Sequence, residues 1–118
     1  MSFNNTGKHA MLDHVKTLAT HLRLYDDDGA EIQWQEASQD KEVTWGNAGA
    51  VDDGEVHATS QPVFDIPGGT TVAEIAYINN TGATEYARDV LDVADQETYA
   101  NDGTYTVQTA KMILTDPT

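Results

Sequence analysis

The sequence predicts a mainly β fold: an antiparallel, jelly-roll-like β-sandwich with one short N-terminal helix. Short strand-like segments arrive about every 8–12 residues, a spacing typical of sandwich and jelly-roll proteins. Turn signals separate them, among them Asp28-Gly29, Gly68-Gly69 and Asn101-Asp102-Gly103. Only one segment has apolar residues at helical spacing. The 118 residues suit a single domain, which we place at 8–118.

The N-terminal region divides at Lys8. Residues 1–7 are polar and end in Gly7, a composition typical of a flexible arm. After them, apolar residues recur at the spacing of a helical stripe. The pattern predicts a helix over 8–19 with Thr6 as its N-terminal cap. The stripe consists of Met11, Leu12, Val15, Leu18, Ala19 and Leu22.

Downstream of the helix the apolar period shortens to two, which predicts strands. The first runs from Thr20 to Tyr25 and ends in the turn at 26–29. Residues 70–78 are rich in β-branched side chains and form the predicted central strand, whereas 62–67 begins and ends in proline and suits a sheet edge. In 85–94 the apolar residues also lie near helical spacing, and we favour a strand. The other predicted strands are 32–35, 43–45, 55–60, 104–109 and 111–115.

Charge is the most unusual global property of the chain. Twenty Asp and Glu residues against six Lys and Arg residues give a net charge of −14. Nucleic-acid binding needs cationic side chains that displace counterions from phosphates, and an anionic membrane repels an acidic chain, so we expect neither partner. Dispersed acids and scarce lysines are typical of proteins from salt-adapted organisms such as haloarchaea, because concentrated salt screens the repulsion among the carboxylates. The sequence therefore predicts a halophilic protein.

The chain offers little for catalysis. It has no Cys, which excludes disulfides, thiolate zinc sites and thiol catalysis. Ser2, Ser38 and Ser60 lie outside any Gly-x-Ser-x-Gly turn, and the four histidines are scattered, which favours surface or core positions over the alternative of a zinc site. The N-terminus has no apolar signal-peptide region, and no apolar run has the length of a transmembrane helix. We expect a non-enzymatic protein that stays in the cell or in a particle assembled there.

Acidic clusters beside glycines are the candidate cation sites. The segment at 26–29 superficially matches a calcium loop, but placing Gly29 sixth puts Leu24 first and Gln35 last, where carboxylates are needed. Plain hairpin turns are the alternative, since Asp and Gly favour turns for backbone reasons. No cofactor is expected beyond a structural Ca²⁺, Mg²⁺ or Na⁺. The candidate ligands are Asp26, Asp28, Asp52, Asp53 and Asp102.

Four segments resemble a known group of proteins. They follow one another in a fixed order along the chain. These segments are the helix and Thr-His-x-x-Leu strand at 11–25, the Val-Thr-Trp segment at 42–48, the Pro-Gly-Gly-Thr-Thr-Val segment at 62–77 and the Gly-Thr-Tyr-Thr ending at 103–114. Together they resemble small structural proteins encoded in the virion gene clusters of tailed phages and tailed haloarchaeal viruses, described as minor tail, fibre-like or capsid-accessory proteins. Residues 85–97 depart from that pattern, because they are acidic where a Gly-rich stretch is expected. The resemblance implies a β-sandwich that multimerises in a virion and carries no catalytic residues.

These observations lead to a functional hypothesis. We expect a structural subunit of a tailed-virus particle, in a capsid decoration, turret, tail, adaptor or baseplate, assembled in the host cytoplasm with copies of itself and other virion proteins. A β-sandwich module that binds carbohydrate or a host surface is the alternative. Apolar and aromatic anchors dominate protein interfaces. The predicted interface residues are Met11, Leu12, Val15, Leu18, Trp34 and Trp45.

Overall fold

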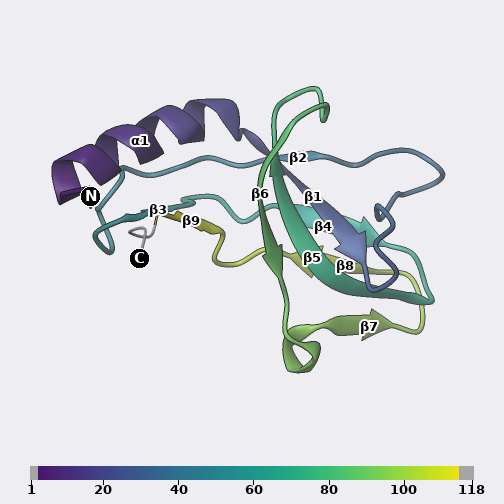
Figure 1. Cartoon of the computed structure of the whole chain (residues 1–118). Coiled ribbons are helices and arrows are strands. Elements are labelled where there is room, and N and C mark those ends of the chain that lie inside the picture. Colours follow the sequence, from purple (N-terminus) through teal and green to yellow (C-terminus); the bar gives the residue numbers. More distant parts are fainter. Residues whose placement is uncertain (1–2, 115–118) are drawn as a thin grey trace.

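The computed structural model describes residues 3–114 of the chain. Within them lie one α-helix, α1 (Asn5–Leu18), one short 3-10 helix, η1 (Val93–Asp95), and strands β1 to β9. Every strand pairing is antiparallel. The helix lies at one end of the molecule, beside β3 and β9, and the largest sheet lies at the other (Figure 1). The prediction of a mainly β, antiparallel fold with one helix is confirmed.

Helix α1 begins three residues before the predicted start. Asn4, in extended conformation, accepts a hydrogen bond from the backbone N–H of Gly7 through its side chain (2.8 Å). Asn is a strong N-cap because its short side chain reaches the free N–H groups of the first turn. The predicted cap, Thr6, therefore lies inside the helix, as does part of the segment predicted as an arm. Only Leu12 of α1 is buried.

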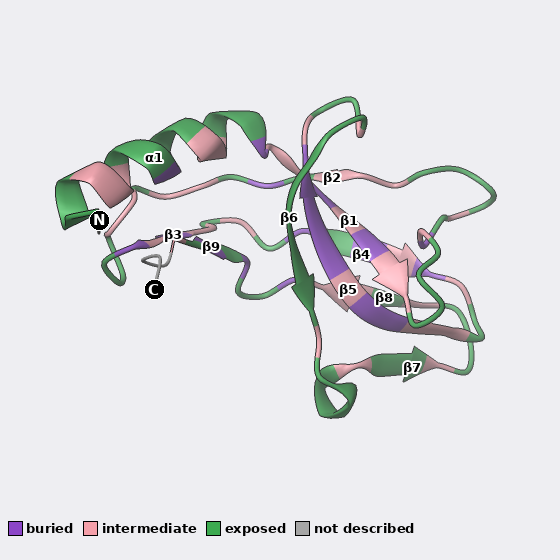
Figure 2. Ribbon diagram, viewed as in Figure 1, coloured by how far each residue is buried: buried purple, intermediate pink, exposed green. Residues whose placement is uncertain are grey.

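The largest sheet has strand order β2-β1-β5-β6, and β7 pairs with the beginning of β5. Strand β5 is central, as predicted: β1 lies on one side, and β6 and β7 follow one another along the other. It is also the most buried strand, whereas β6 is exposed throughout (Figure 2). The strands are β1 (His21–Asp26), β2 (Lys41–Glu42), β5 (Thr70–Ile78), β6 (Glu85–Val90) and β7 (Glu97–Tyr99).

Two ribbons complete the fold. One pairs β3 (Glu55–His57) with β9 (Lys111–Ile113), and the other pairs β4 (Val63–Ile66) with β8 (Gly103–Thr106). Both ribbons share one apolar core with the large sheet and α1. Burial of this apolar surface is the main force that holds the elements together. Its most completely buried side chains are Leu22, Leu24, Val56, Phe64, Ile66, Val72 and Tyr77.

Two predicted strands differ from the structure. Residues 32–35 form no continuous strand, because the chain turns tightly at 34–37. Trp34 and Ala37 exchange backbone hydrogen bonds around Gln35 and Glu36, whose φ values of 52° and 67° suit a primed hairpin turn. The predicted strand at 85–94 ends at Val90, and η1 and β7 follow it. The last link to the sheet in this region is the bond from the Leu91 N–H to the carbonyl of Ala73 (2.9 Å).

The remaining predicted strands are shorter than expected. No strand lies at 43–45: β2 ends just before this segment, which makes only a single bridge, between Trp45 and Ala58. The segment 55–60 is β3, and 104–109 is β8 with its last residues outside the ladder. The closing strand predicted at 111–115 is β9, and residue 115 lies outside the described residues.

Candidate interaction surface

Strand β6 is exposed at all six positions, although it belongs to the largest sheet. Among residues 3–114 it pairs only with β5, so its other edge carries no strand. Exposed apolar side chains lie along and just beyond it: Tyr86 is 39% exposed, Val90 71% and Val93 84%. Isolated edge strands of this kind offer hydrogen-bonding groups to any chain that can pair with them.

The backbone geometry shows which groups face the free edge. The Leu91 N–H bonds to Ala73 of β5, and in an antiparallel ladder the bonding direction alternates along the strand. Asp89 and Ala87 therefore direct their backbone groups to β5, with which they are in register. The N–H and C=O groups of Arg88 and Val90 point outward, where a further strand would lie.

An apolar groove lies beside β6. It has a volume of about 690 Å³ and runs between α1, β6 and β9. Two of its residues, Met11 and Ile113, are 40% and 54% exposed, whereas Leu12 and Met112 also belong to the core. The apolar residues from α1 and the C-terminal ribbon are Met11, Leu12, Val15, Met112, Ile113 and Leu114.

Polar contacts hold β6 against the central strand from the groove side. The hydroxyl of Tyr77 donates to Asp89 (2.5 Å). Burial of the ring, together with the hydrogen bond to Asp89, raises the pKa of Tyr77 well above its ordinary value. Tyr77 also stacks on Trp45, with ring centroids 5.9 Å apart. Tyr77, which lines the groove, is therefore held in place by Trp45 and Asp89, and Asp89 adds a carboxylate to the groove lining.

Two arginines make ion pairs on the opposite face of the sheet, and one of these pairs, Arg88–Glu74, links β6 to β5. Arg23 and Arg88, the two arginines of the chain, both lie in register with Ala76 of β5. Arg23 makes two hydrogen bonds of 2.8 Å to Asp40. Arg88 contacts carboxylates at positions 74 and 85 and stacks over the ring of Tyr25 at 4.0 Å. These hydrogen bonds to carboxylates raise the pKa of both guanidinium groups.

The predicted interface residues divide into accessible and enclosed side chains. Met11 and Leu18 are exposed, and Met11 opens onto the groove. Leu12 is 4% exposed and belongs to the core, against which Val15 packs. The indole N–H of Trp45 donates to the carbonyl of Ala19 (2.8 Å), so this residue is also tied inward. Trp34 is half-buried beside its tight turn.

Sequence reasoning did not select β6 or Ile113. The available signal was the ambiguous pattern of 85–94, where acids and apolar residues alternate with no period that buries either face. Such a segment suits a strand exposed on both sides. The groove itself could not be seen, since it forms where α1, β6 and β9 meet and these are far apart in the sequence.

The predicted cation ligands lie in three separate places. Asp26 and Asp28 share a turn with Asp27, and an Asp26 carboxylate oxygen accepts the N–H groups of Asp28 and Ala30. Asp102 accepts the N–H of Gly68 (2.8 Å). These carboxylates therefore serve the turns in which they lie.

The third place holds Asp52 and Asp53, which point in different directions. Asp53 accepts a hydrogen bond from Asn5 and lies 3.7 Å from the ring of His9. Asp52 instead approaches Glu55 and His57.

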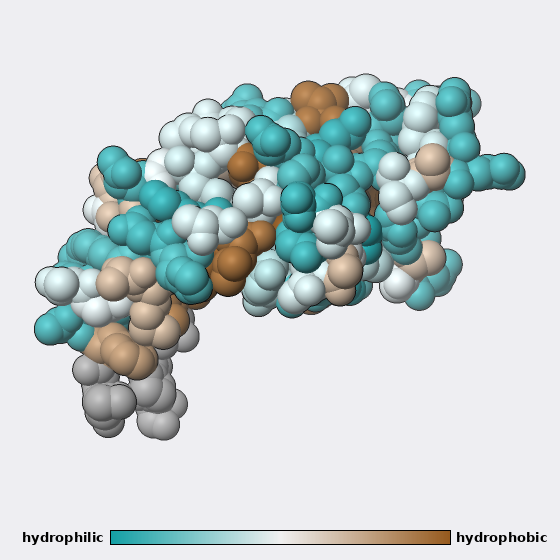
Figure 3. All heavy atoms as spheres, turned by 90° about the horizontal axis from the view of Figure 1, so that it is seen from above, coloured by the Kyte–Doolittle hydropathy of each residue, from teal (hydrophilic) through white to brown (hydrophobic). Residues whose placement is uncertain are grey.

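Comparisons with protein-family models, curated proteins and solved structures found no match for this chain. In the described part of the chain, no helix has both the length and the apolar character needed to cross a membrane. The surface seen from above is largely hydrophilic, with small separate apolar patches (Figure 3).

Proposed function

We propose that this protein is a non-enzymatic structural subunit that assembles with copies of itself through β6 and the adjoining groove. The observation that carries the proposal is a six-residue edge strand, exposed at every position, beside an apolar groove. A strand that buries none of its own side chains gains the most when another chain covers it. Pairing would satisfy the outward N–H and C=O groups of Arg88 and Val90, and would bury Val90 itself.

A second copy suits this edge because β6 carries charges of both signs. Glu85 and Asp89 are negative and Arg88 is positive. Two antiparallel copies of the strand can therefore place each arginine near an acid of the other copy, and opposite charges across a strand pair are stabilising. The net charge of −14 opposes association at low ionic strength. Salt screens that repulsion, so assembly is favoured in concentrated salt.

The setting of the assembly is a tailed-virus particle, in its head or its tail, formed in the host cytoplasm. The ordered resemblance of four segments to virion structural proteins supports this part of the proposal. The shared core between the large sheet and the two ribbons supports a jelly-roll-like sandwich as the subunit's architecture. An acidic surface facing concentrated salt suits a haloarchaeal virus.

Sedimentation of groove variants tests the proposal. The double variant Met11→Gln/Ile113→Gln replaces two exposed groove residues, and Val51→Gln/Val63→Gln replaces two exposed residues outside the groove. In about 2–3 M NaCl, where charge repulsion is screened, we expect wild type and the control pair to sediment as one oligomer and the groove pair as a smaller species. A monomeric wild type, or an unchanged groove variant, would contradict the proposal.

A further inference from the structure

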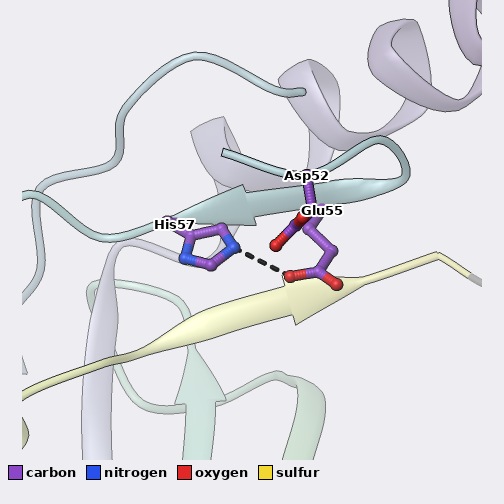
Figure 4. A group of neighbouring side chains, drawn as sticks. All are labelled: Asp52, Glu55 and His57. Atoms are coloured by element: carbon purple, nitrogen blue, oxygen red, sulfur yellow. Dashed lines mark hydrogen bonds and ion pairs between the residues drawn. The ribbon is translucent and has the colours of Figure 1, made fainter. Parts of the chain in front are cut away.

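Three metal-ligating side chains converge at the start of β3. Figure 4 shows Asp52, Glu55 and His57 directed toward a common point, with the ring of His57 facing the carboxylate of Glu55. One donor atom from each residue lies within 4.8 Å of the other two. The His57 Nε2 and Glu55 Oε1 atoms are 2.8 Å apart. A divalent ion with bonds of about 2.0–2.2 Å to nitrogen and oxygen fits among donors at such separations after small side-chain shifts.

Local structure explains why these residues meet. Glu55 and His57 are two positions apart on β3, so their side chains leave the same face of the strand, while Val56 between them enters the core. Asp52 precedes the strand in a turn closed by the bond from the Glu55 N–H to its carbonyl (3.2 Å). The donor set is thus the short pattern Asp-x-x-Glu-x-His on a strand that β9 and the core hold in place.

The chemistry of the donors separates this cluster from the other acidic turns. An imidazole with two carboxylates is a set that Zn²⁺ and similar transition metals accept, with the remaining position open to water. The turn at 26–28 offers carboxylates alone, and one of them already accepts two backbone N–H groups. Asp52 is exposed, so an ion can reach the cluster from solvent.

We propose that Asp52, Glu55 and His57 form a binding site for a divalent transition metal of the Zn²⁺ class. In the bound state the ion lies between His57 and Glu55, in place of the hydrogen bond that joins them. This site is separate from the groove and from β6, and the inference stands whether or not the protein assembles as proposed.

One neighbouring cation opposes the ion. The ammonium group of Lys111, which is in register with His57 on β9, lies 3.5 Å from the same Glu55 oxygen that faces the imidazole. Lys111 therefore offsets the negative charge of Glu55 and competes with a metal ion for it. This arrangement predicts that the affinity of the site for the metal rises when the charge of Lys111 is removed. A diffuse acidic surface would not respond so strongly to the loss of one particular lysine.

Calorimetric titration with Zn²⁺ tests the proposal. In about 1 M NaCl, which screens the diffuse attraction of cations to an acidic chain, we expect one Zn²⁺ per wild-type chain. His57→Asn should weaken binding on the order of tenfold or more, since a direct ligand is lost. Lys111→Met should tighten it about fivefold, because a like charge near the ion is removed. Asp26→Asn/Asp28→Asn is the matched control and should leave the affinity unchanged.

The variants also separate the proposal from nonspecific binding. All four positions altered in these three variants are at least partly exposed, and circular dichroism verifies that each variant remains folded. Absence of Zn²⁺ binding by wild type would overturn the proposal. Equal binding by wild type and His57→Asn, or loss of binding in the Asp26→Asn/Asp28→Asn control, would also overturn it.

Discussion

The hydroxyl of Tyr77 donates a hydrogen bond to Asp89 and so joins the most buried strand of the sheet to its most exposed one. The Tyr77 ring is 1% exposed and packs against Trp45, while Asp89 lies on β6. Together with the Arg88 ion pairs on the other face, this bond positions an edge strand that contributes little to the core. The account of β6 as an interface depends on that positioning.

Replacing Tyr77 by Phe removes this bond and keeps the ring. The expected loss is about 1 kcal/mol of unfolding free energy, the net contribution of a typical hydrogen bond, since the Asp89 carboxylate can turn to water. Amide hydrogen exchange should quicken in β6 more than in β1, which also pairs with β5. If the exchange rates of both strands were the same in Tyr77→Phe as in wild type, the bond would not hold β6.

Alkaline pH should destabilise the protein through the same residue. Burial, and then the bond to Asp89, raises the pKa of Tyr77, whereas a tyrosine in the unfolded chain ionises near pH 10. The contribution of Tyr77 to the free energy of unfolding is fully present below about pH 10. It is lost as pH rises further, because the tyrosine of the unfolded chain releases its hydroxyl proton while the buried tyrosine of the folded chain keeps it. The slope for this group is about −1.4 kcal/mol per pH unit.

Comparing the pH dependence of stability in wild type and in Tyr77→Phe isolates the part of the slope that is due to Tyr77. Burial also raises the pKa values of Tyr99 and Tyr105, so both proteins should lose stability at high pH. Urea unfolding between about pH 9 and about pH 11, around the pKa of an unfolded tyrosine, should show a shallower decline in stability for the variant. Parallel declines would mean that Tyr77 ionises equally in the folded and unfolded states.

Two glycines allow the Arg23–Asp40 pair to be tested. Gly82 (φ 75°) and Gly29 (φ 82°) both have left-handed backbones, but a Cβ at Gly82 would collide with Arg23 and Asp40, while one at Gly29 would meet open space. Gly29→Ala should cost about 1–2 kcal/mol for the backbone alone. Gly82→Ala should cost about 1.5–3 kcal/mol more, because it displaces charge-assisted hydrogen bonds. Thermal unfolding of both variants measures the difference, and equal losses would contradict a role of the ion pair.

Salt should stabilise the folded protein. With a net charge of −14, repulsion among acids is stronger in the compact state than in the unfolded chain. Raising NaCl from about 0.1 M to about 1 M shortens the screening length from about 10 Å to about 3 Å. Urea midpoints should therefore increase over this range at constant protein concentration. A midpoint that falls with salt would indicate that ion pairs such as those of Arg88 outweigh the repulsion.

The sequence predicted the fold where local patterns and burial agree. The central strand at 70–78 and the first strand after the helix were predictable because their β-branched and alternating residues are also the buried ones. The sequence did not reveal the turn around Gln35 and Glu36, since its positive φ values fall on residues that rarely adopt them. Apolar Ile32 and Trp34 suggested a strand there.

The two candidate sites differ in how far sequence could locate them. Asp52 was a predicted cation ligand, but its convergence with Glu55 and His57 was not predicted, because it depends on the β3 conformation and the turn before it. The helix stripe contributed Met11 to the groove, whereas Leu12 proved to be a core residue. Which face of an amphipathic helix meets the core, and which residues at its margin stay exposed, is decided by tertiary packing.

The central claim is that the outer edge of β6 pairs with a second copy of the chain, and Val90→Pro tests it most directly. Because the Val90 N–H points away from β5, proline there removes an outward donor while leaving the β5–β6 bonds in place. Light scattering in about 2–3 M NaCl measures the mass of both proteins. The account predicts an oligomer for wild type and a folded monomer for Val90→Pro; a wild-type monomer, or equal oligomeric masses, would contradict it.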